Sequence, residues 1–299
     1  DISANFEDNR IVQLSAGSQH CVALTATGTL YSWGQNHSGQ LAHGDTVDRL
    51  VPEVVRTVIL WNVTLKRKVV RACVGELHTV LATSDGQLFA VGDNNDTILG
   101  IGPRSDVVVH PRSILIPTAS SRPFISPSVS PSPQSTSIGG STSTPNATTS
   151  TSNIDSHGSS PKAAQDEPIT NVDIDTLGRH SLAIGTDGRA LSWGMSTHGQ
   201  LGHGMCEPSF IPRPIISLEN IKVVQVECGW SHSLCLSEDG RVFSFGDGSD
   251  GKLGLGNDLD FVVPFPINYF INNKIAIKTI AAGHFHSSAV DTKGFLYTW

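Results

Sequence analysis

The chain has 299 residues, of which 29 are glycine and 16 are proline, while only 16% are charged. This composition disfavours a helical bundle, and one large all-β domain can reach this length. The net charge of −7 disfavours nucleic acid as the main partner, and we interpret the short basic run Lys66-Arg67-Lys68 as the solvated start of a strand. No apolar run is long enough to cross a bilayer.

The five cysteines predict a reducing compartment. Their number is odd and no CxxC pair occurs, so we expect reduced thiols in a cytoplasmic protein, with a nuclear location as the alternative. No signal peptide is visible. The chain begins at Asp1 and stops at Trp299 inside a repeated motif, so we expect it to be a fragment.

A repeat organises most of the chain. Five histidines are each followed eight residues later by a turn glycine, and after the first four of these a second glycine comes six residues further on. The repeated positions are His20, His78, His180, His232, His286, Gly34, Gly92, Gly194 and Gly246. A spacing kept in four copies indicates structural units of one kind.

Each unit predicts the same elements in chain order. An apolar run such as 21–24 is of buried-strand length, and pairs such as Asp85-Gly86 predict a type I′ hairpin turn. The returning strand ends in the second glycine, mostly after an aromatic residue. A glycine-rich loop and a proline-headed strand follow. About four strands in just over 50 residues are typical of a β-propeller blade.

One interval between anchor histidines is twice the others, 102 residues against 52 to 58. It contains a Ser/Thr/Pro-rich segment that cannot bury enough apolar surface to offset its ordering entropy. We therefore expect propeller repeats one and two at 1–117, a disordered insert at 118–168, and repeats three to five at 169–299 with the last truncated. A lost and decayed blade also fits the length.

These motifs resemble a known family. Gly17-Ser-Gln-His20, Leu191-Ser-Trp-Gly194 and Gly199-Gln-Leu-Gly-His-Gly204 are similar to the repeat of the regulator of chromosome condensation family. The resemblance implies an all-β, seven-bladed propeller that is incomplete here, with about four and a half repeats. The unit around 91–102 and the shifted glycine before His180 depart from the pattern and suggest local irregularity.

The recurring histidines are interpreted as structural anchors, because a catalytic or metal-binding group has no reason to recur in every blade. The glycine-rich run 246–253 is the repeat loop, since Leu253 stands where a phosphate loop needs Ser or Thr. No nucleophile motif is present. We therefore predict no catalytic residue, no cofactor and no metal site.

The insert carries a different signal. Five of its hydroxyl residues precede proline and are candidates for proline-directed phosphorylation, with a featureless spacer as the alternative. They are Ser126, Ser130, Ser132, Thr144 and Ser160.

A propeller without an active site predicts a protein-binding platform. The runs 243–248 and 251–257 look most like the propellers of the giant HERC ubiquitin ligases, whose catalytic cysteine lies in a separate C-terminal domain. This resemblance implies a recruiting module of a larger protein, with ubiquitin-pathway substrates as partners. The alternative is guanine-nucleotide exchange on a Ran-like small GTPase, as in the family's founding member.

Overall fold

The computed structural model describes residues 10–114, 116, 174–185 and 187–299. The chain divides into two units, of which the first comprises 1–117 and 167–299 and the second 118–166. The predicted disorder of the insert and its five candidate phosphorylation sites (Ser126, Ser130, Ser132, Thr144 and Ser160) lie outside the described residues.

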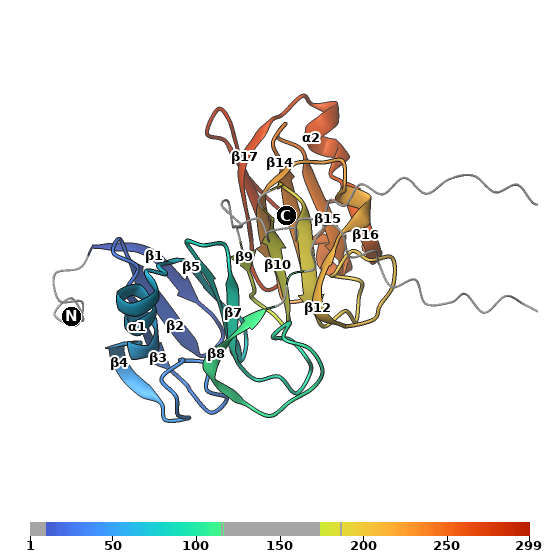
Figure 1. Ribbon diagram of the computed structural model, residues 1–299. Helices are drawn as coiled ribbons and strands as arrows, with labels where there is room; N and C mark the ends of the chain where they lie inside the picture. Colours follow the sequence, from blue (N-terminus) through green and yellow to red (C-terminus); the bar gives the residue numbers. More distant parts are fainter. Residues whose placement is uncertain (1–9, 115, 117–173, 186) are drawn as a thin grey trace, which may run out of the picture. The chain divides into compact units, whose positions relative to one another are not determined.

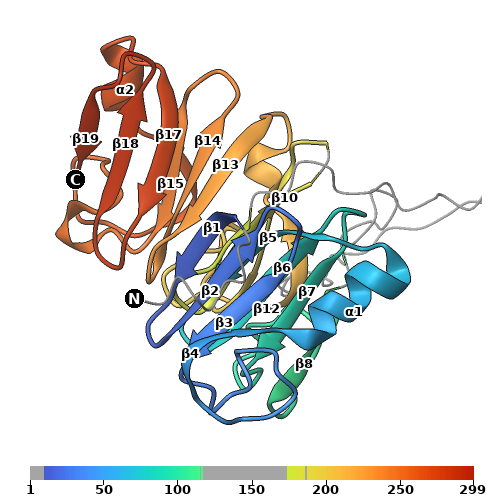
Figure 2. The same ribbon diagram turned by 90° about the vertical axis from the view of Figure 1, so that its left-hand side faces the viewer.

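The described part of the first unit forms five antiparallel sheets (Figures 1 and 2). The first sheet holds β1 (Ile11–Ala16), β2 (His20–Thr25), β3 (Leu30–Gly34) and β4 (Arg49–Val54). The second holds β5 (Val69–Val74), β6 (His78–Thr83), β7 (Leu88–Gly92) and β8 (Val108–Ile114). The third holds β9 (Ile174–Asp175), β10 (His180–Ile184), β11 (Ala190–Gly194) and β12 (Ser209–Pro214).

The fourth sheet holds β13 (Val223–Cys228), β14 (His232–Ser237), β15 (Val242–Gly246) and β16 (Phe261–Pro266). The fifth holds β17 (Ile277–Ala282), β18 (Ser287–Asp291) and β19 (Leu296–Thr298). Short helices lie between strands: α1 (Arg56–Leu65), η2 (Ile216–Leu218), η3 (Ser249–Gly251) and α2 (Asn268–Asn272).

The described residues thus form an all-β, five-bladed propeller. The prediction of an incomplete seven-bladed propeller with about four and a half repeats was wrong, because five sheets are formed and the last has three strands. The number seven came from the family resemblance, since repeat spacing defines a blade but not how many blades a ring holds. The irregular third unit still makes a four-stranded sheet, although its β9 is only two residues long.

The hairpin turns differ from the predicted type I′ form. In the second sheet the backbone N–H of Thr83 bonds the carbonyl of Gln87 over 3.0 Å, so three residues form the loop. Only the glycine of that loop has a positive φ, 79° at Gly86, and Gly240 in the fourth sheet repeats this at 82°. The Asp-Gly pair therefore belongs to a three-residue loop, in which glycine takes the left-handed position.

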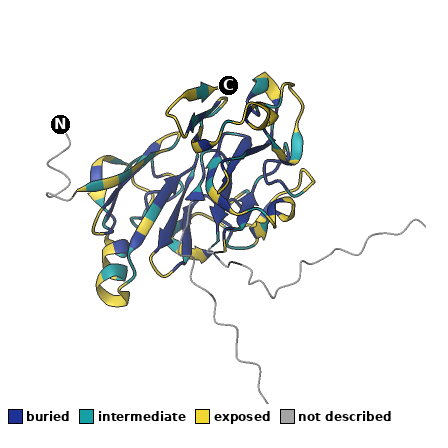
Figure 3. Cartoon of the chain, turned by 90° about the horizontal axis from the view of Figure 1, so that it is seen from above, coloured by how far each residue is buried: buried dark blue, intermediate teal, exposed yellow. Residues whose placement is uncertain are grey.

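The core lies between neighbouring sheets. Trp193 on β11 packs with Val80 and Leu99 of the second blade, and Phe245 on β15 packs with Leu182 of the third. Both aromatic side chains are fully buried. Buried residues accordingly follow the strands, while exposed ones gather in the connections (Figure 3). Neighbouring sheets bury their facing sides against each other, which is why one blade cannot fold alone.

The innermost strands of neighbouring sheets contact one another in the order β1, β5, β9, β13 and β17. Each is the edge of its own sheet and therefore has backbone groups without a strand partner. A side chain from the preceding inner strand supplies the missing bonds. Gln13 on β1 donates its amide to the Ala72 carbonyl over 2.9 Å and accepts from the Ala72 N–H over 3.0 Å.

Candidate functional site

The candidate site is the end of the sheets at which the third strand of each blade turns into the fourth. In the four blades with four strands these loops are 35–48, 93–107, 195–208 and 247–260. The short connections between the first and second strands lie at the same end. We call these two sets of connections together the loop end. The opposite end, with the hairpins and the helices α1, η2 and α2, is the hairpin end.

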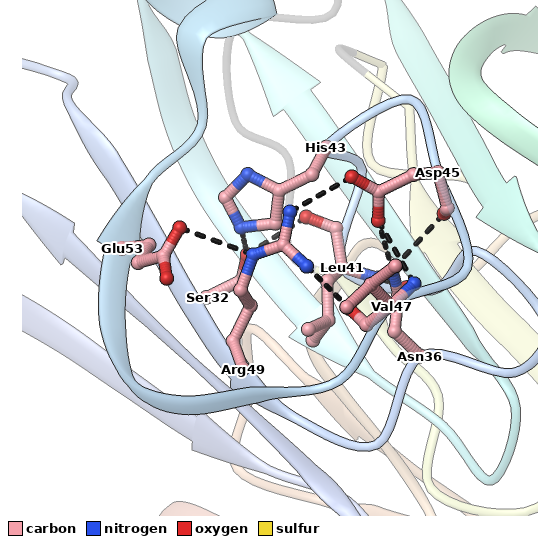
Figure 4. Close-up of polar contacts among 8 residues, drawn as sticks. All are labelled: Ser32, Asn36, Leu41, His43, Asp45, Val47, Arg49 and Glu53. Atoms are coloured by element: carbon pink, nitrogen blue, oxygen red, sulfur yellow. Dashed lines mark hydrogen bonds and ion pairs between the residues drawn. The ribbon is translucent and has the colours of Figure 1, made fainter.

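The loop of the first blade is held by one asparagine (Figure 4). The side-chain amide of Asn36 donates to the carbonyls of Asp45 and Val47 over 3.0 and 3.1 Å. Its oxygen accepts the N–H of Leu41 over 2.9 Å. One side chain thus ties both arms of the loop together, so the loop presents a preformed surface. Asn94 makes the corresponding bond to the Leu99 N–H in the second blade.

Arg49 closes the same loop from the outside (Figure 4). Its guanidinium contacts the carboxylates of Asp45 over 2.8 Å and Glu53 over 3.0 Å, and it donates to the Val47 carbonyl over 2.6 Å. Arg49 and the Val47 N–H hold the pKa of Asp45 below its usual range. The carboxylate therefore stays charged at neutral pH and keeps its bonds to Arg49 and the Val47 N–H within the loop.

A serine and a histidine lie close together under this loop, but they are not a nucleophile and its base. The hydroxyl of Ser32 donates to the Leu41 carbonyl over 2.7 Å, so the Nε2 of His43, 3.0 Å away, must be the donor to Ser32. Burial and the charge of Arg49 lower the pKa of His43. Ser192 and His203 repeat the arrangement in the third blade, as expected for a structural element.

Among the described residues, one group of three could provide metal ligands: His198, Asp247 and Asp260. The ammonium of the buried Lys252 lies 3.0 Å from a carboxylate oxygen of Asp247. Burial alone would raise the pKa of Asp247, but bonds from the Ser249 N–H, Lys252 and other donors hold it well below its usual range. The charge of this carboxylate is already compensated by Lys252, so the group does not offer a cation a favourable site.

The anchor histidines join neighbouring blades. The Nε2 of His20 lies 2.9 Å from the hydroxyl of Thr79, and that hydroxyl donates to the Gln40 carbonyl. The histidine must therefore be the donor, which leaves its Nδ1 without a proton and, in the described structure, without a partner. His180 and Ser233, and His232 and Ser287, repeat the bond over 2.8 and 2.9 Å.

His78 bonds the Thr176 hydroxyl over 2.5 Å, because the irregular third unit places this threonine beside it. Burial lowers the pKa of His78 and His180 to about 3, and that of His20 and His232 to about 4. The fifth anchor, His286, is exposed in the last blade. The four buried imidazoles are therefore neutral at physiological pH and act as donors between blades.

The anchor glycines lie beside these histidines. Gly34 has a φ of 107°, and a Cβ built there would lie 2.5 Å from the carbonyl oxygen of Gln19. Gly92, Gly194 and Gly246 have the same positive φ and the same close carbonyl from the residue before the anchor histidine of their blade. The position requires glycine because backbone passes where a side chain would begin.

Sequence reasoning missed a half-buried pair of carboxylic acids on the inner strands. Asp175 on β9 accepts the Cys228 N–H over 2.6 Å, and Glu227 on β13 accepts the side-chain amide of Gln225 over 2.7 Å. Burial raises the pKa of Asp175 to about 6, and burial together with the charge of Asp175 raises that of Glu227 to about 8. The alternation of side chains along a strand could have placed these two residues together only if the contact between the inner strands β9 and β13 had been known.

The buried cysteines are packing residues. The thiol of Cys73 donates to the Ile174 carbonyl over 2.7 Å, and that of Cys228 donates to the Asp175 carbonyl over 3.1 Å. Burial raises the pKa of both thiols above the usual value. They are therefore protonated and unreactive.

Charge is unevenly distributed between the two ends of the sheets. The described connections at the loop end carry eleven carboxylates and three basic side chains. Those at the hairpin end carry five carboxylates and nine basic side chains. The loop end is therefore acidic and the hairpin end basic, which a net charge for the whole chain conceals.

The fold and the repeated loops define a propeller whose blades share one sequence motif, which is the class of protein-interaction propellers. The RCC1-like domain profile matches residues 2–299, and the chain belongs to this family. The chain contains no described helix long and apolar enough to cross a membrane.

Three known proteins illustrate the relationship. The ultraviolet-B receptor UVR8 of Arabidopsis thaliana is 29% identical over 290 residues, which cover 97% of this chain and 53% of that protein. Human E3 ubiquitin-protein ligase HERC2 is 28% identical over 292 residues, 97% of this chain and 5% of HERC2. The chain thus spans about half of UVR8 and a small part of HERC2.

The crystal structure of Prp20p from Saccharomyces cerevisiae superposes with a TM-score of 0.65 at 20% identity, covering 94% of this chain and 56% of that one. This likeness establishes the fold.

Proposed function

We propose that the chain is the recruiting propeller of a larger, cytosolic, HERC-type ubiquitin ligase, and that it holds a protein partner on its acidic loop end. The observation that carries this proposal is the combination of loops fixed by their own hydrogen bonds with an excess of carboxylates. A preformed surface loses little conformational entropy on binding. A surface of one charge selects partners of the opposite charge.

Two of the three basic side chains at the loop end are engaged within the loops. Arg179 pairs with Glu76 and Asp96, and Lys252 pairs with Asp247. Exposed carboxylates such as those of Asp250 and Asp258 therefore set the charge that a partner meets. The partner we infer is a protein segment rich in lysine or arginine.

The relatives support a module within a larger protein. The name of HERC2 describes an E3 ubiquitin-protein ligase, and the matching part is 5% of its length. By contrast, Prp20p is described by its binding to Gsp1p and histones. Nucleotide exchange on a Ran-like GTPase is therefore the alternative, and the experiment has to distinguish it from ubiquitin transfer.

The test uses the native full-length protein, purified with an antibody against this chain. It is incubated with ubiquitin, activating enzyme, conjugating enzyme and ATP, and in parallel with a Ran-type GTPase loaded with a fluorescent nucleotide. We expect ubiquitin transfer that is lost when the purified protein alone is alkylated and freed of reagent before the other enzymes are added. Accelerated nucleotide release without ubiquitin transfer would contradict the proposal and favour the exchange factor.

The recruiting surface is tested by removing charge. Asp250→Asn with Asp258→Asn should weaken retention of the ubiquitylated partner, and asparagine also tolerates the positive φ of 58° at Asp250. Glu219→Gln with Glu238→Gln removes the same charge at the hairpin end and serves as the control. Equal partner retention by both double variants would refute binding at the loop end.

A further inference from the structure

Helix α1 is fixed to the first two blades by one of its sides. Val58 is fully buried, and the ring of Trp61 lies 4.5 Å from that of Phe89 on β7. The side chain of Asn62 donates to the carbonyl of Thr27 over 3.3 Å. The helix therefore has a defined inward side, and the residues three and four positions apart on its other side point outward.

The outward side of α1 is apolar. Leu60 is 59% exposed, Val63 is 73% exposed and Leu65 is 59% exposed, with Ile59 beside them at 38%. A surface helix normally turns charged or polar residues outward. Adjacent exposed aliphatic side chains on one short helix indicate an interaction surface.

Basic residues flank this apolar side, and carboxylates are absent from it. Arg56 stands in the first turn and Lys66 caps the helix, both exposed, with Arg67 and Lys68 following. Between residues 54 and 75 the sequence contains no Asp or Glu. Arg67 is engaged with Asp85, so Arg56 and Lys66 are the cations best placed to meet a partner.

The same combination of exposed apolar and basic side chains occurs in other connections of the hairpin end. Ile216 on η2, Tyr269 and Ile271 on α2, and Phe295 in the last hairpin are exposed by 61%, 57%, 42% and 63%. Seven of the nine basic side chains of this end belong to these connections and to that of α1. Apolar and basic groups therefore occur together in the connections of four blades.

We propose that the hairpin end, led by α1, docks on an anionic lipid surface, with its aliphatic side chains entering the headgroup region and its cations meeting lipid phosphates and carboxylates. Charge complementarity requires an acidic partner. The apolar groups are spread over separate connections, so a bilayer surface can meet all of them at once, whereas a peptide would reach only those on one connection. The acidic loop end is then turned away from the membrane and remains free for a protein partner.

The experiment measures co-sedimentation of the 299-residue chain with vesicles of phosphatidylcholine, alone and with phosphatidylserine added. We expect binding to the anionic vesicles that weakens as salt is raised. Arg56→Gln with Lys66→Asn should reduce the partition coefficient about 25-fold, since each basic residue near such a surface contributes about fivefold. Leu60→Ser with Val63→Ser should reduce it at unchanged salt dependence.

Matched controls are Arg104→Gln and Leu259→Ser, which remove an exposed cation and an exposed aliphatic group at the loop end. They should bind as the unmodified chain does, and thermal unfolding should show that every variant is folded. The proposal is overturned by equal binding to neutral and anionic vesicles, by α1 variants that bind normally, or by binding to an acidic peptide but not to vesicles.

Discussion

Gln225 on β13 bonds both backbone groups of Ile280 on β17. Its side-chain amide donates to the Ile280 carbonyl over 2.7 Å, and its oxygen accepts the Ile280 N–H over 3.0 Å. Gln13 does the same for Ala72 between the first two blades. One amide side chain thus acts as a short strand neighbour at the inner edge of the next sheet, where no further strand pairs.

Replacing this amide should destabilise the protein. Gln225→Ala leaves the backbone N–H and carbonyl of Ile280 without their partner, and an unsatisfied buried polar group costs about 1 to 3 kcal/mol. The free energy of unfolding, measured by urea denaturation, should fall by about that amount. Gln19→Ala, in an exposed connection, is the control and should change it by less than about 0.5 kcal/mol.

The anchor histidines should differ in their contribution according to burial. His232→Ala removes a buried donor and opens a cavity between the fourth and fifth blades, so we expect a loss of about 2 to 4 kcal/mol in the free energy of unfolding. His286→Ala stands at the same repeat position but is exposed, and should cost less than about 0.5 kcal/mol. Equal losses would mean that the bond between blades contributes nothing.

Two glycines separate steric from conformational requirements. At Gly246 a Cβ would lie 2.5 Å from the Ser231 carbonyl oxygen, and φ is 104°. At Gly256 φ is 80° but nothing lies within 4 Å of the added atom. Gly256→Ala should therefore lower the free energy of unfolding by about 1 to 2 kcal/mol, because alanine disfavours the left-handed conformation. Gly246→Ala should lower it clearly more, because the steric clash is added. The difference between their melting temperatures measures the clash.

Stability should pass through a maximum near pH 7. The buried histidines have lowered pKa values, so below about pH 6.5 the unfolded chain binds protons that the folded protein does not, and stability falls as the pH drops. Asp175 and Glu227 have raised pKa values of about 6 and 8, so the folded protein keeps protons that the unfolded chain releases. Their contribution falls as the pH rises towards 8.

Glu227→Gln tests the alkaline limb. This variant should lose most of the decline in unfolding free energy between pH 7 and 8 and keep the decline below pH 6.5. Denaturant titrations at several pH values provide the measurement. An alkaline limb unchanged by the substitution would show that another group is responsible.

The sequence predicted the blade and its strands because repeat spacing records local structure. The histidine, the turn and the closing glycine lie within 14 residues, so their geometry is a short-range property visible in each copy. Partners in the next blade were not predicted. Thr79 and Gln225 act across 59 and 55 residues, and only the three-dimensional pairing of sheets shows what they bond.

The number of blades and the division of charge were missed for the same reason. Ring size follows from the angle between packed sheets, which no single repeat encodes. The excess of carboxylates at the loop end appears only when each connection is assigned to one end of its strands. Lys252 illustrates the difference between a sequence motif and a contact in the fold. It stands in a run that resembles a phosphate loop, but in the structure it is the buried partner of Asp247.

Hydrogen–deuterium exchange on the chain, alone and bound to the partner that co-purifies with the native protein, tests the recruiting surface most directly. Binding at the acidic loop end predicts slower exchange in loops 35–48, 93–107, 195–208 and 247–260, with 55–68 and 267–276 unchanged. Protection confined to 55–68, 267–276 and the hairpins would contradict the account.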